Sequence, residues 1–308
     1  MRVFVCAELG QISPNALGLA GDVLVHDTGH DPAGPAPEDF LACEVALGNP
    51  PAAWLAAAPQ MRWVQLESVG FGEYVGLDWD ALGRRLTLTN LAGFFAEPVA
   101  ESALAGLLGL YRGVDQLVAL RAGRIWLGDD IRPKLRTLRG ANVVLFGYGA
   151  INRRLAELLA PFGCRITTFD SQWVAAALDA ALGAADIVVS VVPHTARTKG
   201  VFDRRRLALL PETALFANFG RGSVVDEAAL AEALQRGSLA GAVVDVTMDE
   251  PLPVGHPFWA CPNLILTQHS GGGTADETAR KIAIFAANLA RYRRGEPLQG
   301  VVDFHRGY

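Results

Sequence analysis

The feature that most constrains the fold is a series of short, almost entirely apolar runs between residues 142 and 268. In chain order they are NVVLFGYG, CRITTFD, DIVVSVV, TALFANFG, GAVVDV and NLILTQ. Runs of this length that lack an alternating polar face are typical of strands buried on both faces of a parallel sheet. The Ala- and Leu-rich segments between them, such as DEAALAEALQRGS, suit crossover helices. The pattern predicts six strands in a doubly wound α/β domain.

Residues 1–90 show a second alternation, with shorter strands and longer loops. Five runs predict strands: RVFVCA, DVLVHD, CEVALG, MRWVQL and RLTLTN. Short segments such as PPAAWLAAAP suit helices, and stretches such as HDPAGPAPEDF must be loops. The chain has 308 residues, which is enough for two domains with separate cores. We therefore expect a small α/β domain with a mainly parallel sheet before the doubly wound one.

Two segments predict longer helices. Residues 98–123 are apolar on most faces and predict one long helix, which we expect to be buried between domains or subunits. Residues 277–295 carry Ile282, Phe285, Leu289 and Tyr292 on one stripe, so this helix should pack one face against a domain. The sequence does not say which domain receives it.

Composition excludes several classes of partner. The net charge of −5 argues against broad attraction to nucleic acid or to an anionic membrane. No apolar run approaches the roughly 18 residues of a membrane span. Met1-Arg2 leads into a short strand-like run instead of a long apolar one, so we expect no signal peptide. The four cysteines form no C-x-x-C pair and no metal-type spacing, so we expect reduced thiols in a cytoplasmic protein and no metal site.

The first apolar run of the second series ends in the turn GYGAIN. Gly147 and Gly149 occupy the first two positions of a G-x-G-x-x-G fingerprint, and Asn152 stands at the third. Alone, this turn is as typical of an ordinary strand–helix connection as of a nucleotide site. Asp170 ends the next strand about 20 residues later, where an acid holds the ribose hydroxyl of NAD and repels the phosphate of NADP. The glycine turn together with Asp170 predicts binding of NAD(H), although NADP(H) is not excluded. Alternatively, Asp170 could simply end a strand.

Three later segments each follow a predicted strand and carry reactive side chains. They are NFGRGSVVDEAAL (218–230), VVDVTMDEPLP (243–253) and LTQHSGGGT (266–274), which supply Arg221, Glu250 and His269. A guanidinium clamps a carboxylate, and a histidine beside a carboxylate exchanges protons near neutral pH. Each residue alone would suit a turn or a structural role. Their joint occurrence at successive strand ends favours a catalytic set.

These motifs, in this order, resemble the D-isomer-specific 2-hydroxyacid dehydrogenase family over most of the chain. The family's cofactor entry, its P-x-T-x-x-T-x-G segment and its glycine-rich substrate loop are similar to LRTLRGANVVLFGYGAI, VVPHTARTKGVF and SVGFGEYVGLD (68–78). The resemblance is to enzymes that reduce glyoxylate or hydroxypyruvate. It implies interconversion of a small 2-keto acid and its D-2-hydroxy acid with NAD(H).

The resemblance also implies a domain organisation. Residues 1–93 and 275–308 would form a discontinuous, flavodoxin-like substrate domain, which assigns the last helix to it. Residues 94–274 would form a Rossmann-type NAD-binding domain. The protein would be a homodimer.

By the family's mechanism, His269 would protonate the keto oxygen as NADH delivers hydride, Glu250 would hydrogen-bond the imidazole, and Arg221 would bind the substrate carboxylate. Backbone amides at Val69 and Gly70 would also bind the carboxylate, and Asp245 would meet the nicotinamide carboxamide. The residues expected to line the cofactor are Gly147, Gly149, Ala150, Ile151, Asp170, Pro193, Phe219, Gly220, Asp245 and Gly271.

The chain departs from the family pattern in three places. Asn152 replaces the third glycine, and we expect it to displace the following helix slightly. The segment between Asp170 and Asp186 is shorter than usual, which trims the region around the adenosine. Gln268 stands where the family usually has proline before the histidine. An alternative function, which the trimmed region permits, is a catalytically idle NAD(H)-sensing regulator of the corepressor kind.

Overall fold

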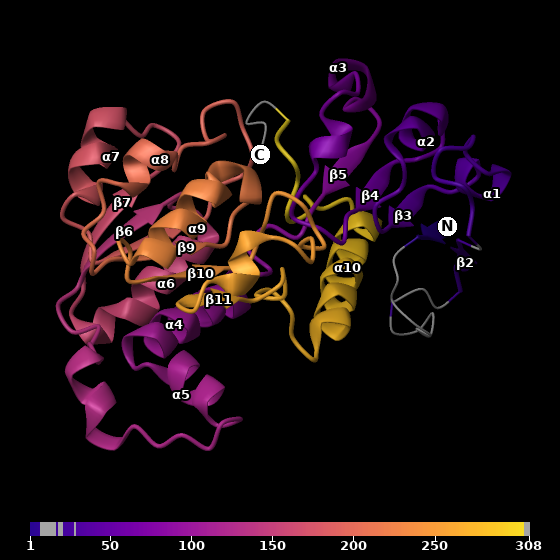
Figure 1. Ribbon diagram of the computed structural model, residues 1–308. Coiled ribbons are helices and arrows are strands. Elements are labelled where there is room, and N and C mark those ends of the chain that lie inside the picture. The colour runs from indigo at the N-terminus through magenta and orange to yellow at the C-terminus, as the bar shows by residue number, and fades with distance from the viewer. Residues whose placement is uncertain (7–16, 18–20, 28, 305–308) are drawn as a thin grey trace. The chain divides into compact units, whose positions relative to one another are not determined.

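The computed structural model describes residues 1–6, 17, 21–27 and 29–304. The chain divides into two compact units (Figure 1). Unit 1 comprises Met1–Phe94 and Thr274–Tyr308, and unit 2 comprises Phe95–Gly273.

Unit 1 is built on a five-stranded parallel sheet with the order β2-β1-β3-β4-β5. Its strands are β1 (Arg2–Val5), β2 (Val23–His26), β3 (Val45–Leu47), β4 (Trp63–Gln65) and β5 (Thr87–Thr89). Its first helices are α1 (Glu38–Leu41), α2 (Ala52–Ala57) and α3 (Trp79–Leu82), with a 3₁₀ turn η1 (Gly72–Tyr74). This strand order is that of flavodoxin, so the expected flavodoxin-like sheet is confirmed.

The last helix, α10 (Glu277–Arg293), packs on the sheet of unit 1. The rings of Phe285 and Tyr292 stack on Trp63, with centroids 5.2 and 5.6 Å away. Asn288 is buried and donates from Nδ2 to Gln65 Oε1 at 3.0 Å. The apolar stripe seen in the sequence is therefore the face that covers β4.

Unit 2 is built on a six-stranded parallel sheet with the order β11-β10-β9-β8-β6-β7. The strands are β6 (Asn142–Phe146), β7 (Arg165–Phe169), β8 (Ile187–Ser190), β9 (Leu215–Asn218), β10 (Gly241–Val244) and β11 (Leu264–Leu266). The predicted strands are confirmed. The short segment after Asp170 forms one helix, α7 (Ala175–Leu182), so β7 lies at the edge of the sheet and most of its side chains are exposed or partly exposed.

Helices cover both faces of this sheet (Figure 1). One face packs on α4 (Ala96–Tyr111) and α6 (Ala150–Leu159). The other face packs on α7, α8 (Arg204–Leu207) and α9 (Glu227–Arg236). Alternate residues of a strand point to opposite faces, so Val143 and Leu145 join the first core while Val144 and Phe146 join the second. The remaining short turns are η2 (Gly128–Lys134), η3 (Ala160–Phe162), η4 (Gly222–Val224) and η5 (Pro257–Ala260).

The expectation of one long helix over residues 98–123 is wrong. The chain breaks at Gly113 into α4 and α5 (Val114–Leu120), which meet at 69°. Gly113 is left-handed, with φ 63°, and an added Cβ would lie 2.9 Å from Ile131 Cδ1, so a larger residue fits poorly. α4 has seven buried residues, whereas no residue of α5 is buried.

No single helix in the described residues is long and apolar enough to cross a membrane. Helices α4 and α5 together reach the necessary length and apolar composition, but the chain bends by 69° between them.

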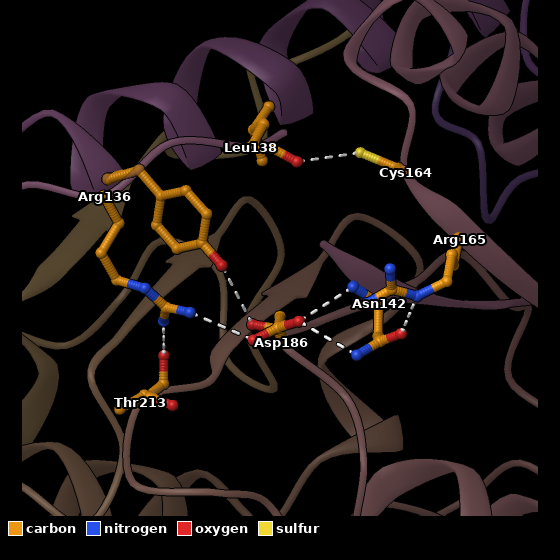
Figure 2. Close-up of polar contacts among 8 residues, drawn as sticks. Arg136, Leu138, Asn142, Cys164, Arg165, Asp186 and Thr213 are labelled. Carbon is orange, nitrogen blue, oxygen red and sulfur yellow. Dashed lines mark hydrogen bonds and ion pairs between the residues drawn. The ribbon is translucent and has the colours of Figure 1, made fainter. Parts of the chain in front are cut away.

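A polar network closes the amino-terminal edge of the sheet in unit 2 (Figure 2). Asp186, just before β8, accepts hydrogen bonds at Oδ2 from Asn142 N (2.9 Å) and Asn142 Nδ2 (3.2 Å). Arg136 donates to Asp186 Oδ1 at 3.1 Å, and its guanidinium lies 4.9 Å from the centre of the Tyr111 ring. The Asp186 carboxylate thus joins the start of β8 to the start of β6 and to Arg136, which lies in the segment just before β6.

We expect Asp186→Ala to destabilise the protein by about 1–3 kcal/mol, because the variant leaves several donors without their charged acceptor. Denaturant unfolding measures the loss. The control is Asp129→Ala, since Asp129 is 89% exposed and pairs only across the surface with Arg132. Equal stability of the two variants would show that the network does not stabilise the sheet.

Candidate active site

Three neighbouring strands bring the predicted catalytic residues to one edge of the sheet. β9 ends at Asn218, β10 at Val244 and β11 at Leu266, and all three run in parallel. Arg221, Glu250 and His269 lie in the segments that follow. Residues far apart in the sequence are therefore brought to the same carboxyl edge of the sheet, which is where doubly wound sheets bind ligands.

Glu250 and His269 form a direct pair. Imidazole Nδ1 lies 2.7 Å from Glu250 Oε2, and Thr247 N donates to Glu250 Oε1 at 3.0 Å. Because the carboxylate engages Nδ1, Nε2 is the ring nitrogen left to exchange a proton. Partial burial opposes ionisation of Glu250, but the two hydrogen bonds and the positive charge at His269 and Arg221 outweigh it, so the pKa of Glu250 lies below its usual value.

Asp245 organises the backbone that carries His269. Its main-chain oxygen accepts from His269 N at 2.6 Å, and its Oδ1 accepts from Thr267 Oγ1 (2.5 Å) and Gly271 N (3.0 Å). Gly271 leaves room for this contact, since an added Cβ would lie 3.1 Å from Asp245 Oδ2. The buried carboxylate thus fixes the histidine loop, a role that the sequence did not predict.

The backbone at Gln268 and His269 is left-handed, with φ 53° at both residues. A non-glycine residue pays about 1–3 kcal/mol for this conformation, which persists where the surrounding contacts enforce it. Proline is fixed near φ −65° and cannot adopt it. The departure from the family's proline at this position therefore agrees with the local backbone.

Arg221 is an exposed residue between β9 and η4, and the glycines on either side of it are buried. Its Nη1 donates to Gly220 O at 2.8 Å. The next residue, Gly222, packs against the Thr247–Met248 peptide so closely that an added Cβ would lie 2.0 Å from Thr247 C. The turn that carries Arg221 and the loop that carries Glu250 therefore touch through their backbones.

A cavity of about 440 Å³ lies beside the Glu250–His269 pair. Its polar wall includes both members of the pair, and Leu252, Trp259 and Leu266 contribute an apolar wall. No cluster of three or more potential metal ligands occurs among the residues that the structure describes.

The turn before α6 fits a dinucleotide pyrophosphate. Gly147 has φ 90°, and an added Cβ there would lie 2.3 Å from Val191 O, so only glycine allows this approach. The space over Gly149 is open, since an added Cβ would meet nothing within 4 Å. Ala150 and Ile151 begin the helix, where N–H groups lack partners within the helix and attract anions.

Asn152 takes the place of the missing third glycine in an unexpected way. Its side chain is fully buried, and its Nδ2 donates to Phe146 O (3.2 Å) and Gly147 O (3.1 Å). The amide therefore ties the first turn of α6 to the end of β6. The side chain that we expected to displace the helix is buried between α6 and the sheet, and its amide binds carbonyl oxygens on the sheet side.

The loop after β7 brings together an acid and a cation. Asp170 is exposed and accepts from Gln172 N at 2.8 Å. Arg197 donates to Ser171 O (2.6 Å) and Trp173 O (2.9 Å), and its guanidinium lies 5.4 Å from the Trp173 ring centre. Arg197 is a residue that the sequence did not single out, because its partners are main-chain oxygens of a distant loop.

The other predicted residues occupy loops of their own unit. Pro193 follows β8, and its O accepts from Thr198 Oγ1 at 2.6 Å. Phe219 is buried and follows β9, and its N donates to Ser190 O at 2.9 Å. Val69 and Gly70 lie in an exposed loop after β4 in unit 1, where Val69 O accepts from Asn90 Nδ2 at 2.8 Å.

Comparison with known proteins identifies relatives over nearly the whole chain. A family model described as "D-isomer specific 2-hydroxyacid dehydrogenase, NAD binding domain" matches residues 104–271. A glyoxylate reductase of Aeropyrum pernix is 32% identical over 81% of this chain and 78% of its own length.

Two solved structures share the fold. One is a D-isomer specific 2-hydroxyacid dehydrogenase from Xanthobacter autotrophicus in complex with NADPH and MES, at 28% identity, with a TM-score of 0.77 and coverage of 100% of this chain and 99% of that chain. The other is an NADPH-dependent glyoxylate/hydroxypyruvate reductase from Sinorhizobium meliloti in complex with citrate, at 27% identity, with a TM-score of 0.76 and 98% of each chain covered. The chain therefore belongs to the D-isomer specific 2-hydroxyacid dehydrogenase family of oxidoreductases, which act on CH–OH groups.

Proposed function

We propose that the protein interconverts a small 2-keto acid and its D-2-hydroxy acid, and works mainly as a glyoxylate or hydroxypyruvate reductase with NADH. The observation that carries this proposal is the 2.7 Å pair of His269 and Glu250 on the sheet edge that also bears Arg221. Relatives named for glyoxylate or hydroxypyruvate reduction support the substrate class.

The geometry of the Glu250–His269 pair and the family resemblance support the following roles. A bound nicotinamide nucleotide supplies or accepts the hydride. His269 donates the proton from Nε2 to the keto oxygen during reduction and recovers it during oxidation. Glu250 holds Nδ1 and stabilises the protonated ring, and Arg221 binds the substrate carboxylate.

We assign residues 1–93 and 275–308 to the substrate domain, with the Val69 and Gly70 amides binding the substrate carboxylate. Residues 94–274 hold the cofactor, with its pyrophosphate at the turn after β6. Asp245 meets the nicotinamide carboxamide in this proposal, in addition to fixing the histidine loop. The four cysteines are free thiols, in keeping with a reducing cytoplasm.

His269→Ala should lower turnover by about 10²–10⁴-fold, because general acid–base catalysis contributes on that scale. The assay follows NADH absorbance with a panel of 2-keto acids, and fluorescence titration should show that NADH binding is retained. His30→Ala, an exposed histidine of unit 1, is the matched control. If the wild-type protein binds NADH but turns over no keto acid, the regulator alternative replaces the enzyme.

Asp170→Ala should narrow the preference for NADH over NADPH by about tenfold. A tenfold change in the ratio of dissociation constants corresponds to the loss of one interaction of about 1.4 kcal/mol. Asp170 opposes the extra phosphate of NADPH, whereas Arg197, bound to the same loop, attracts it. One related structure contains NADPH and another is described as NADPH-dependent, so the opposing effects of Asp170 and Arg197 bear directly on cofactor choice. Dissociation constants for both nucleotides test the prediction, and an unchanged ratio would show that Asp170 does not read the ribose.

We propose a homodimer in which α5 and the loop after it contact the partner. Exposed apolar side chains gather there: Val114, Leu117, Val118, Ile125 and Trp126. Surface patches of this kind commonly mark protein interfaces.

Val118→Lys combined with Trp126→Asp should shift the protein toward monomer, as measured by light scattering on a sizing column. Val254→Lys, at a still more exposed apolar residue in a loop outside this patch, should leave the mass unchanged. A double variant that stays dimeric would assign the interface elsewhere, and a monomeric wild type would reject the dimer.

A further inference from the structure

A second carboxylate–imidazole pair lies behind the loop that carries Glu250. Glu227, the first residue of α9, accepts at Oε1 from Met248 N at 2.8 Å. Met248 lies between Thr247, whose N–H binds Glu250, and Glu250 itself. A side chain outside the proposed catalytic set therefore holds the middle of the catalytic loop.

The other oxygen of Glu227 faces His256. Glu227 Oε2 lies 3.3 Å from His256 Nε2, and Phe258 N donates to His256 Nδ1, also at 3.3 Å. Since Nδ1 accepts this bond, Nε2 carries the hydrogen that points at Glu227. The side chains of Glu227 and His256 are only 14% and 19% exposed, against 38% and 55% for Glu250 and His269. The rear pair is sheltered, whereas the front pair is open to a substrate.

The Thr247–Met248 peptide is also the point where the turn bearing Arg221 touches the loop. Gly222 has no room for a Cβ against that peptide. Glu227 thus fixes the peptide from behind, and Gly222 packs against the same peptide. A shift of this one peptide would move Glu250 relative to both Arg221 and His269.

We propose that Glu227, backed by His256, is a positioning residue for the reaction, which holds the Met248 amide so that Glu250 stays aligned with His269. This inference rests on the proposed function for its catalytic readout, but the alignment itself is independent of the substrate.

The unfavourable burial of the Glu227 carboxylate supports this positioning role. Burial raises the pKa of Glu227, and nearby Asp249 adds to that effect, while the Met248 N–H and His256 act against it. A carboxylate removed from water contributes little net stability even when it is paired. A residue that served packing alone could be apolar, whereas fixing an amide N–H requires an acceptor.

The test compares Glu227→Ala, which removes the acceptor, with Glu227→Gln, which keeps one oxygen for Met248. Glu232→Ala is the control, because Glu232 lies on the same helix and pairs with Arg204 and Arg236 at the surface. Three properties are measured: kcat and KM for keto-acid reduction, thermal stability, and the downfield proton NMR signal of the His269 Nδ1–H, assigned by its loss in His269→Ala.

We expect Glu227→Ala to lower kcat by about 10- to 100-fold with little change in NADH affinity, because small displacements of catalytic groups cost rate on that scale. Its His269 Nδ1–H signal should weaken or disappear. Glu227→Gln keeps an acceptor for Met248 but turns its NH2 group toward the His256 Nε2–H, so it should retain more of both properties than Glu227→Ala without matching the wild type. Glu232→Ala should match the wild type.

A loss of thermal stability in Glu227→Ala without a change in kcat or in the NMR signal would reduce Glu227 to a structural residue. A Gln variant as impaired as the Ala variant would show that an acceptor for the Met248 amide is not sufficient to keep Glu250 aligned with His269. If the wild-type protein turns over no keto acid while the NMR signal still depends on Glu227, the proposed function fails and the alignment stands.

Discussion

Parallel pairing of β9, β10 and β11 is the constraint on which the site depends. Because the three strands run in the same direction, the segments after Asn218, Val244 and Leu266 emerge at one edge. Each segment contributes one member of the predicted set Arg221, Glu250 and His269, so none of them holds the set alone. The chemistry then depends on backbone contacts between the segments, namely Gly222 against Thr247 and the bonds from Thr267, His269 and Gly271 to Asp245.

Much of this arrangement was predictable from the sequence. The spacing of apolar residues indicates the strands, and the order of the motifs indicates which residues follow the strand ends. The runs that predicted β1 to β11 all form strands, and the stripe on α10 packs as its spacing required. The pairing of Glu250 with His269 was expected from the family resemblance, and the structure gives it a distance.

Other features left no local signal. The break occurs at Gly113, whose left-handed backbone glycine allows, but Gly106 and Gly109 of the same segment are helical, so a glycine alone does not mark the break. The bonds of Arg197 go to main-chain oxygens, which carry no sequence identity. Asn152 was read as a steric cost because spacing alone does not show that two carbonyl oxygens lie within reach of its amide.

The left-handed backbone at Gln268 has a consequence for how this chain can change over time. Proline at that position is excluded by its ring, so a single codon change toward the commoner family residue would disturb the loop rather than restore a pattern. The acceptable residues at 268 are set by the contacts of Asp245, Thr267 and Gly271, which enforce the conformation. A residue at 268 that changes the path of the chain would therefore also move Thr267 and Gly271 away from the Asp245 carboxylate that binds them.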